Sequence, residues 1–281
     1  MKLLRYGPVG QEKPGILDKE GRIRDLSDFV KDIDGATLSP TKLAELAEIN
    51  PESLSVVHGT HRVGPCVARP LNFVLIGLNY ADHAAETGMA APKEPIVFLK
   101  SLSAFCGPND VLPIPRGSSK TDWEVELGIV IGTKASYVSE ENAMDHVAGY
   151  CVINDVSERE YQIERGGQWD KGKGCDGFGP VGPWMVTKDE IADPQDLHMW
   201  ADVDGVRMQD GSTKTMIFGV KKLVSYVSQF ITLHPGDLIS TGTPPGVGMA
   251  KKPNPIFLKA GQTVKIGVAG LGEQEQKTIA A

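Results

Sequence analysis

Three carboxylates at the ends of two apolar segments are the first residues whose spacing suggests shared chemistry. Glu124 and Glu126 in "TDWEVELGIVIG" alternate with Val125 and Leu127, so in a β-strand both carboxylates point to one face. Asp155 ends the apolar run "YCVIND", where a strand pattern gives way to a helix pattern. Adjacent carboxylates repel unless a cation lies between them, and oxygen ligands favour Mg²⁺ or Mn²⁺ over zinc. A polar face on an edge strand would also explain the two glutamates alone.

A histidine and a glutamate follow the apolar segment "NFVLIG". In "GLNYADHAAETG", His83 and Glu86 are three residues apart and would share one face of a helix. Glu86 would then accept a hydrogen bond from one imidazole nitrogen and orient His83 as a general base for a water molecule. The alternative is an ordinary pair on a solvated helix surface.

The stretch "KGKGCDGFGPVGP" contains the GxGxxG spacing of a dinucleotide-binding loop at Gly172, Gly174 and Gly177. Such a loop must follow a strand and open a helix, but here a polar helical pattern precedes it and two prolines follow it. We therefore exclude a nucleotide site. Either the glycines form a flexible loop, or they leave room for Lys173 to approach a ligand.

Composition narrows the class of protein. The chain has 281 residues, 41% hydrophobic content and a formal net charge of -7, with no basic run that would favour nucleic acid. No apolar stretch is long enough to cross a membrane, and the first residues lack the apolar segment of a signal peptide. The four cysteines show no CxxC spacing, which favours a reduced, cytoplasmic protein.

The elements that must position these residues are mostly strands. We expect strands at 2–7, 21–27, 72–79, 95–100, 124–132, 146–155, 179–186, 202–209, 236–242 and 262–268, and helices at 39–49, 80–88, 139–146, 157–165 and 219–230. Ser39 is the expected N-cap of the first helix, before Pro40. Because strands and helices do not alternate, we predict a mixed, β-rich α+β fold rather than a doubly wound sheet. We expect a small α+β domain at 1–70 and a catalytic domain at 71–281.

The ordered set of motifs from about Asn72 to Val268 resembles the fumarylacetoacetate hydrolase superfamily. The matching stretches are "IGLNYADHAAE", "EPIVFLKS", "DWEVELGIVIG", "GYCVINDVSERE", "KGKGCDGFGPVGP" and "STGTPPGVG". The resemblance implies a β-sandwich roll that forms a homodimer. It also implies a divalent metal ion, most often Mg²⁺ with Mn²⁺ and Ca²⁺ as alternatives, at Glu124, Glu126 and Asp155.

The resemblance also implies roles for the remaining residues. His83 and Glu86 match the pair of the acylpyruvase-like members, and a polar trio around the reacting oxygen is matched by Arg159, Gln162 and Lys173. Thr243 matches a threonine that contacts the substrate carboxylate, and Leu78 and Tyr80 are further candidates for substrate binding. The ordinary alternatives are a helix ion pair for Arg159, a surface amide for Gln162 and a turn hydroxyl for Thr243.

The reaction implied by the resemblance is hydrolysis of a 2,4-dioxo acid, either an acylpyruvate or a 2,4-diketo-3-deoxy sugar acid, to pyruvate and a carboxylic acid. Oxaloacetate decarboxylation, a ureidoglycolate-type lyase reaction, and hydration or isomerisation of a 2-oxo acid are alternatives on the same site. A non-catalytic module that binds metal or carboxylates is the alternative outside enzymes. We expect a small-molecule substrate and neither a nucleic-acid nor a membrane partner.

Overall fold

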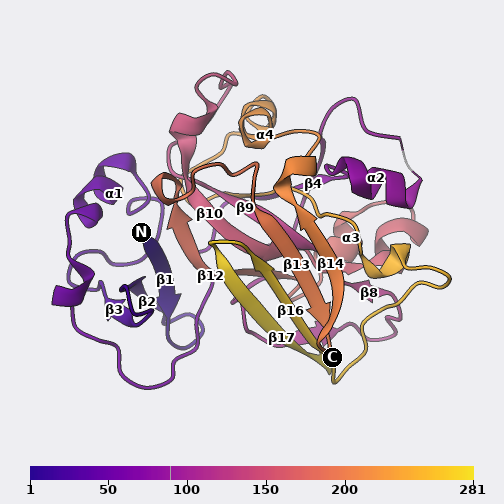
Figure 1. Cartoon of the computed structure of the whole chain (residues 1–281), viewed down its shortest axis with the longest axis horizontal. Helices are drawn as coiled ribbons and strands as arrows, with labels where there is room; N and C mark the ends of the chain where they lie inside the picture. The colour runs from indigo at the N-terminus through magenta and orange to yellow at the C-terminus, as the bar shows by residue number, and fades with distance from the viewer. Residues whose placement is uncertain (89) are drawn as a thin grey trace.

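One large sheet runs through most of the chain (Figure 1). The computed structural model describes residues 1–88 and 90–281. The strands of this ten-stranded sheet are β1 (Lys2–Tyr6), β2 (Lys13–Leu17), β3 (Ile23–Asp25), β4 (Phe73–Gly77), β5 (Ile96–Leu99), β6 (Phe105–Cys106), β9 (Val125–Ile131), β10 (Val147–Asn154), β12 (Gly179–Thr187) and β15 (Leu238–Ser240). Their order is β3-β2-β1-β12-β10-β9-β15-β4-β5, and β6 pairs with β12. The central strands β9 and β10 therefore each pair with a neighbouring strand along both edges.

A second sheet of five strands packs against the first, in front of β9 and β10 in Figure 1. Its strands, in the order β14-β13-β16-β17-β7, are β7 (Leu112–Ile114), β13 (His198–Val203), β14 (Val206–Ser212), β16 (Thr263–Val268) and β17 (Gly272–Ala280). Leu127 and Val152 from the large sheet share one buried cluster with Met199 and Ile266 from this sheet. The mixed, strand-rich fold predicted from the sequence is confirmed.

The opposite face of the large sheet has a core of its own. There, Leu3 and Ile16 pack in one buried cluster with Val130, Ile153 and Leu238. Residues from the first 70 positions thus cover the face of β9 and β10 that lies away from the second sheet. The strands β1–β3 continue the large sheet through the pairing of β1 with β12.

The helices are few and short. They are α1 (Pro40–Ala47), α2 (Ala81–Thr87), α3 (Asp170–Lys173) and α4 (Val220–Val227), with 3-10 turns η1 (Pro51–Ser53), η2 (Ala143–His146), η4 (Lys188–Glu190), η5 (Thr213–Thr215) and η6 (Gly248–Ala250). Ser39 caps α1, since its hydroxyl accepts the Lys42 N–H at 3.4 Å, as predicted. None of the helices among the described residues is long and apolar enough to cross a membrane.

Two predicted helices are wrong in their extent. Residues 139–146 form only the turn η2, because both ends of this segment are bound to neighbouring elements: Tyr137 N–H donates to the Ser228 carbonyl, and the His146 carbonyl accepts from Gly132. Within 157–165, the first two residues pair as strand β11 (Ser157–Glu158) with β8 (Thr121–Asp122), and a single π-helical turn, η3 (Glu160–Glu164), follows.

Strand β17 was not predicted from the sequence. Its inward-facing side chains are Gln274, Gln276 and Thr278, so the buried face is polar and the hydrophobic alternation of a strand is missing. Gln274 Nε2 donates to the carbonyls of Val152 at 2.8 Å and Gly182 at 2.9 Å. Gln274 therefore supplies hydrogen bonds to the backbone of β10 and β12, in place of apolar contacts. Gln276 instead accepts from the Asn154 side chain at 2.9 Å and donates to the Pro108 carbonyl.

Candidate functional site

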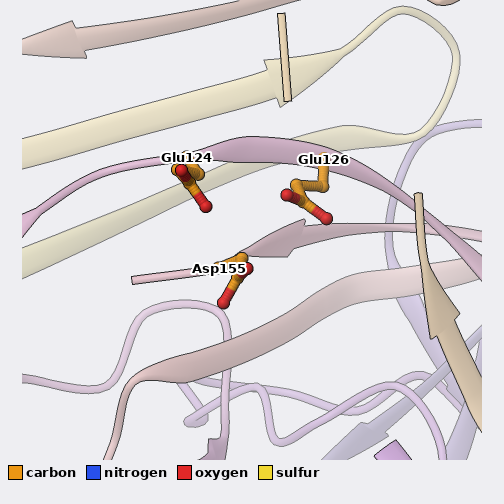
Figure 2. A group of neighbouring side chains, drawn as sticks. All are labelled: Glu124, Glu126 and Asp155. Atoms are coloured by element: carbon orange, nitrogen blue, oxygen red, sulfur yellow. The ribbon is translucent and has the colours of Figure 1, made fainter. Parts of the chain in front are cut away.

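Three carboxylates gather where β9 begins and β10 ends (Figure 2). Glu124 and Glu126 flank Val125, the first residue of β9, and Asp155 follows the last residue of β10. The two strands are antiparallel neighbours, and the Asp155 N–H donates to the Glu124 carbonyl at 2.9 Å. One oxygen from each carboxylate lies within 4.8 Å of the other two, and all three residues are buried. The structure thus brings the three predicted ligands together.

The carboxylate cluster suits a cation. Burial, together with the neighbouring Asp155 and Glu124, raises the pKa of Glu126 well above its ordinary value. Glu126 Oε2 accepts hydrogen bonds from the Ser240 hydroxyl at 2.5 Å and from the Gly242 N–H at 2.9 Å, which fix the orientation of this side chain. Hard oxygen donors at this spacing are the ligands that Mg²⁺, Mn²⁺ and Ca²⁺ prefer. The residues present therefore fit a divalent metal ion.

Lys173 supplies a positive charge inside this cluster. Its Nζ lies 2.5 Å from both Glu124 Oε2 and Asp155 Oδ2. Burial alone would lower the pKa of Lys173, but Asp155 and Glu124 raise it above its ordinary value. Burial likewise opposes ionisation of Glu124, yet Arg159 and Lys173 hold the pKa of Glu124 well below its usual range. Lys173 is therefore an ammonium that neutralises part of the buried negative charge.

Arg159 aligns three side chains around the cluster. Its Nη2 donates to Glu124 Oε1 at 2.7 Å, its Nε to Asp122 Oδ2 at 2.9 Å and its Nη1 to Gln162 Oε1 at 3.1 Å. Burial opposes the charge of Arg159, but Glu124 and Asp122 raise its pKa above the ordinary value. With its oxygen bound to Arg159, the amide of Gln162 keeps its Nε2 donors for another acceptor.

A second buried lysine, Lys100, contacts the same cluster through Asp155. Its Nζ lies 2.5 Å from Asp155 Oδ1 and donates to the carbonyls of Lys173 at 2.6 Å and Val156 at 3.1 Å. Burial lowers the pKa of Lys100, although Asp155 opposes the shift. Sequence reasoning missed both Lys100 and Asp122. The available signal was a charged residue at the end of an apolar strand pattern, as in "PIVFLK".

The histidine and glutamate pair lies on α2. His83 Nδ1 is 3.1 Å from Glu86 Oε2, so the two residues contact each other as the helical spacing predicts. The Gly246 N–H lies 3.1 Å from both oxygens of Glu86 and fixes this carboxylate from the other side. If Glu86 accepts the Nδ1 proton, His83 Nε2 is left as a proton acceptor.

The glycine-rich segment folds differently from the expected flexible loop, because residues 170–173 form the short helix α3. A methyl group added at Gly172 would lie 2.3 Å from the Glu158 carbonyl oxygen and 2.6 Å from Gln162 Cβ. One added at Gly174 would lie 2.8 Å from a carbonyl oxygen of the same turn. The glycines thus allow α3 to pack against β11 and η3. They do not clear space for a ligand around Lys173, as the sequence had suggested.

One cavity brings the predicted residues together. Its lining includes the carboxylates, the two catalytic candidates on α2 and α3, and the polar residues between them: Leu78, His83, Glu124, Glu126, Asp155, Arg159, Gln162, Lys173 and Thr243. Leu78 adopts a left-handed backbone, with φ 52°, between β4 and α2. Such a backbone turns the chain sharply from the sheet into the helix that bears His83.

Two of the predicted substrate-binding residues are engaged elsewhere. Tyr80 is fully buried, and its hydroxyl donates to Met199 Sδ at 3.1 Å, so it lies in the core. Thr243 lines the cavity, but its hydroxyl donates to the Val125 carbonyl at 2.8 Å and accepts from Gln209 Nε2 at 2.8 Å. The Thr243 proton is therefore already used within the protein.

Comparisons with known proteins find relatives in both sequence and fold. The family model for the fumarylacetoacetate (FAA) hydrolase C-terminal domain matches residues 72–279. A protein of Burkholderia orbicola (strain MC0-3) named "Putative hydrolase" is 64% identical over 278 residues, which cover 99% of each chain.

Several solved structures share the fold over the whole chain. A fumarylacetoacetate hydrolase from Exiguobacterium antarcticum has a TM-score of 0.87 and 33% identity, covering 100% of both chains. A probable 2-hydroxyhepta-2,4-diene-1,7-dioate isomerase from Mycobacterium abscessus has a TM-score of 0.82 and 28% identity, covering 100% of this chain and 99% of that one. The maleylpyruvate hydrolase of Sphingobium sp. SYK-6, in complex with manganese(II) and pyruvate, has a TM-score of 0.82 and 26% identity, covering 100% of both.

Proposed function

The chain belongs to the fumarylacetoacetate hydrolase family, and from this premise we propose that it is a metal-dependent hydrolase acting on a 2,4-dioxo acid. The bond cleaved is the carbon–carbon bond between C3 and C4, and the products are pyruvate and a carboxylic acid. One observation carries the proposal: His83, which is paired with Glu86, lines the same cavity as three buried carboxylates and the Lys173 ammonium. A water-activating base and an enolate-stabilising cation thus lie in one site.

Glu124, Glu126 and Asp155 would hold the metal ion. When bound, a divalent cation neutralises negative charge and polarises the oxo group of a chelating substrate. In the sequence of steps, His83 Nε2 takes a proton from a water molecule while Glu86 orients the ring through Nδ1. The resulting hydroxide adds to the C4 carbonyl of the substrate.

The negative charge that forms on the oxygen bound to C4 needs a hydrogen-bond donor. The cavity is lined by Gln162, Gly77 and Leu78. The candidate donors are therefore Gln162 Nε2 and the backbone N–H groups of the turn at Gly77 and Leu78. One such donor is typically worth about 3 kcal/mol of transition-state stabilisation. The C3–C4 bond then breaks, its electron pair stays on C3 as the pyruvate enolate, and the Lys173 ammonium supplies the proton that yields pyruvate.

The test is a panel of 2,4-dioxo acids and oxaloacetate, assayed with Mg²⁺ or Mn²⁺ for pyruvate release. Hydrolysis in H₂¹⁸O must place ¹⁸O in the released carboxylic acid, whereas decarboxylation gives carbon dioxide and isomerisation incorporates no solvent oxygen into a new acid. Release of pyruvate at the full rate after chelation of the metal would contradict metal dependence.

Variants separate the roles of the site residues. Glu126→Ala should lose metal-dependent turnover while the protein stays folded, and Lys173→Ala should lose turnover without losing the His83–Glu86 pair. His83→Ala is the discriminating change: it should abolish hydrolysis but spare a decarboxylase, which needs no activated water. Unchanged hydrolysis in His83→Ala would remove this residue from the chemistry.

A further inference from the structure

The cavity that holds the carboxylates is also lined by apolar side chains. Five side chains form this surface, which we call the distal wall: Leu78, Phe98, Ile163, Trp169 and Met249. They come from the turn after β4, from β5, from η3, from the residue before α3 and from η6. Segments far apart in the sequence thus contribute apolar side chains to the cavity that holds the charged cluster.

The aromatic part of the distal wall is fixed in place. The rings of Phe98 and Trp169 meet edge to face, with centroids 5.3 Å apart. Trp169 also lies against the bare backbone of Gly77, where an added methyl group would come within 2.5 Å of its Cζ3 atom. Only glycine at this position leaves room for the ring, so the chain positions an indole at the cavity rather than a smaller or polar side chain.

The cations of the cavity are already committed to carboxylates. Among the residues that the structure describes, the Lys and Arg side chains lining the cavity are Arg159 and Lys173, and both contact Glu124. The buried cluster as a whole holds four carboxylates against three cations: Asp122, Glu124, Glu126 and Asp155 against Lys100, Arg159 and Lys173. A divalent metal ion would add two positive charges, which would be offset by the fourth carboxylate of the cluster and by the substrate's first carboxylate. No positive charge is then left over for a second carboxylate at the far end of a substrate.

We propose that the acyl half of the substrate is uncharged and presents an alkyl or aryl face to the distal wall. The inference rests on the proposed function and narrows it to acylpyruvates that carry a single carboxylate. A substrate such as maleylpyruvate, which has a second carboxylate at its far end, would have to desolvate that charge against Phe98 and Trp169. The cation nearest to these rings is Lys173, whose Nζ lies 5.4 Å from the Phe98 ring centroid, and it is already paired with Glu124 and Asp155.

The experiment compares two substrates with the same carbon chain, 2,4-dioxoheptanoate and 2,4-dioxoheptanedioate, which differ only in a terminal methyl against a terminal carboxylate. Pyruvate release is measured with both under identical metal conditions. We expect kcat/KM for the monoacid to exceed that for the diacid by a factor on the order of 100, because the charged end loses its hydration without gaining a partner. Equal or preferred cleavage of the diacid would overturn the inference and leave the proposed function standing.

A matched pair of variants locates the discrimination. Ile163 lines the distal wall and is 48% exposed, whereas Ile279 on β17 is 43% exposed and is not among the lining residues. Ile163→Lys places an ammonium at the wall and should shift the preference toward the diacid by about tenfold, whereas Ile279→Lys should leave it unchanged. An equal shift in both variants would show that overall charge, and not the wall, sets the preference. Pyruvate release from neither substrate, nor from any other dioxo acid, would instead refute the proposed function itself.

Discussion

Replacing Gly172 by alanine perturbs the site without touching any group that reacts. Gly172 is buried in α3, directly before Lys173, and its α-carbon faces the backbone of β11 and η3. The added methyl group would lie 2.3 Å from the Glu158 carbonyl oxygen and 2.6 Å from the Gln162 backbone nitrogen. Both contacts are with backbone atoms, so neither can be relieved by rotating a side chain.

The geometry sets the size of the effect. A relaxed carbon–oxygen contact is about 3.3 Å, so α3 must move by about 1 Å. The displacement reaches Lys173, whose Nζ is held 2.5 Å from two carboxylates. A misplacement of about 1 Å typically costs on the order of 100-fold in catalysis. Overpacking should cost about 1–3 kcal/mol of stability, partly offset by roughly 0.5–1 kcal/mol from removing a helical glycine.

The assay is kcat/KM for pyruvate release from the best dioxo acid of the panel, with thermal unfolding measured in parallel. Gly219→Ala is the control, because its added methyl group would meet only the flexible end of Gln195, at 3.1 Å, at the start of α4. We expect a loss of about 100-fold in Gly172→Ala and little change in the control. A folded Gly172→Ala protein with kcat/KM within about threefold of the original would refute the packing argument.

Three further outcomes follow from the ionisable groups. Because burial and the neighbouring Asp155 and Glu124 raise the pKa of Glu126, the metal-free site keeps a proton on Glu126 to higher pH than an ordinary carboxyl group would. Metal binding should release that proton, and the affinity for the metal should increase as pH rises through the raised pKa. Titration calorimetry with Mg²⁺ in several buffers tests this: a heat of binding that did not depend on the ionisation enthalpy of the buffer would contradict the prediction. Lys100→Met breaks a buried ion pair with Asp155, so we expect a loss of about 3–5 kcal/mol and a melting temperature lower by roughly 10 °C in calorimetry. An unchanged melting temperature would rule out that contribution. Burial opposes ionisation of Asp18, but backbone N–H groups and two arginines hold the pKa of Asp18 well below its usual range. Its stabilisation is therefore fully present above the unfolded-state pKa of about 3.9 and is lost as pH falls through the lower folded-state pKa, so the destabilisation of Asp18→Asn in urea should be largest at pH 7 and should begin to shrink as pH falls below about 3.9. A difference in unfolding free energy between the two proteins that stays constant with pH would argue against this linkage.

The sequence predicts the parts of this site that depend on local periodicity. Alternation in β9 correctly places Glu124 and Glu126 on one face, and the helical spacing correctly brings His83 to Glu86. Asp155 could be placed beside the glutamates because it ends a long apolar strand. For the two glutamates and for the His83–Glu86 pair, the geometry is decided within a few residues of the chain, where the backbone period alone fixes the direction of a side chain. Asp155 reaches the glutamates through the pairing of β9 with β10.

The parts that the sequence did not predict depend on contacts between distant segments. Lys100 reaches Asp155 from another strand, and no pattern near "PIVFLK" identifies that partner. The short α3 is set by its packing against Glu158, because four residues with two glycines have little helical tendency of their own. The distal wall is likewise assembled from five separate segments, so its apolar character becomes visible only in three dimensions.

The polar inner face of β17 has a consequence for the order in which the protein can mature. Gln276 Oε1 accepts from Asn154 Nδ2 at 2.9 Å, and Asn154 Oδ1 accepts from the Glu124 N–H at 3.2 Å. Strand β17 is translated after every other strand of the structure, more than a hundred residues after Glu124 and Asp155. While a ribosome still holds residues 272–280, the amide of Asn154 lacks its partner and the backbone of Glu124 loses its indirect support. The hydrogen bond between Asn154 and Gln276 can therefore form only after β17 has been released, although Asn154 and the carboxylates emerge earlier in synthesis.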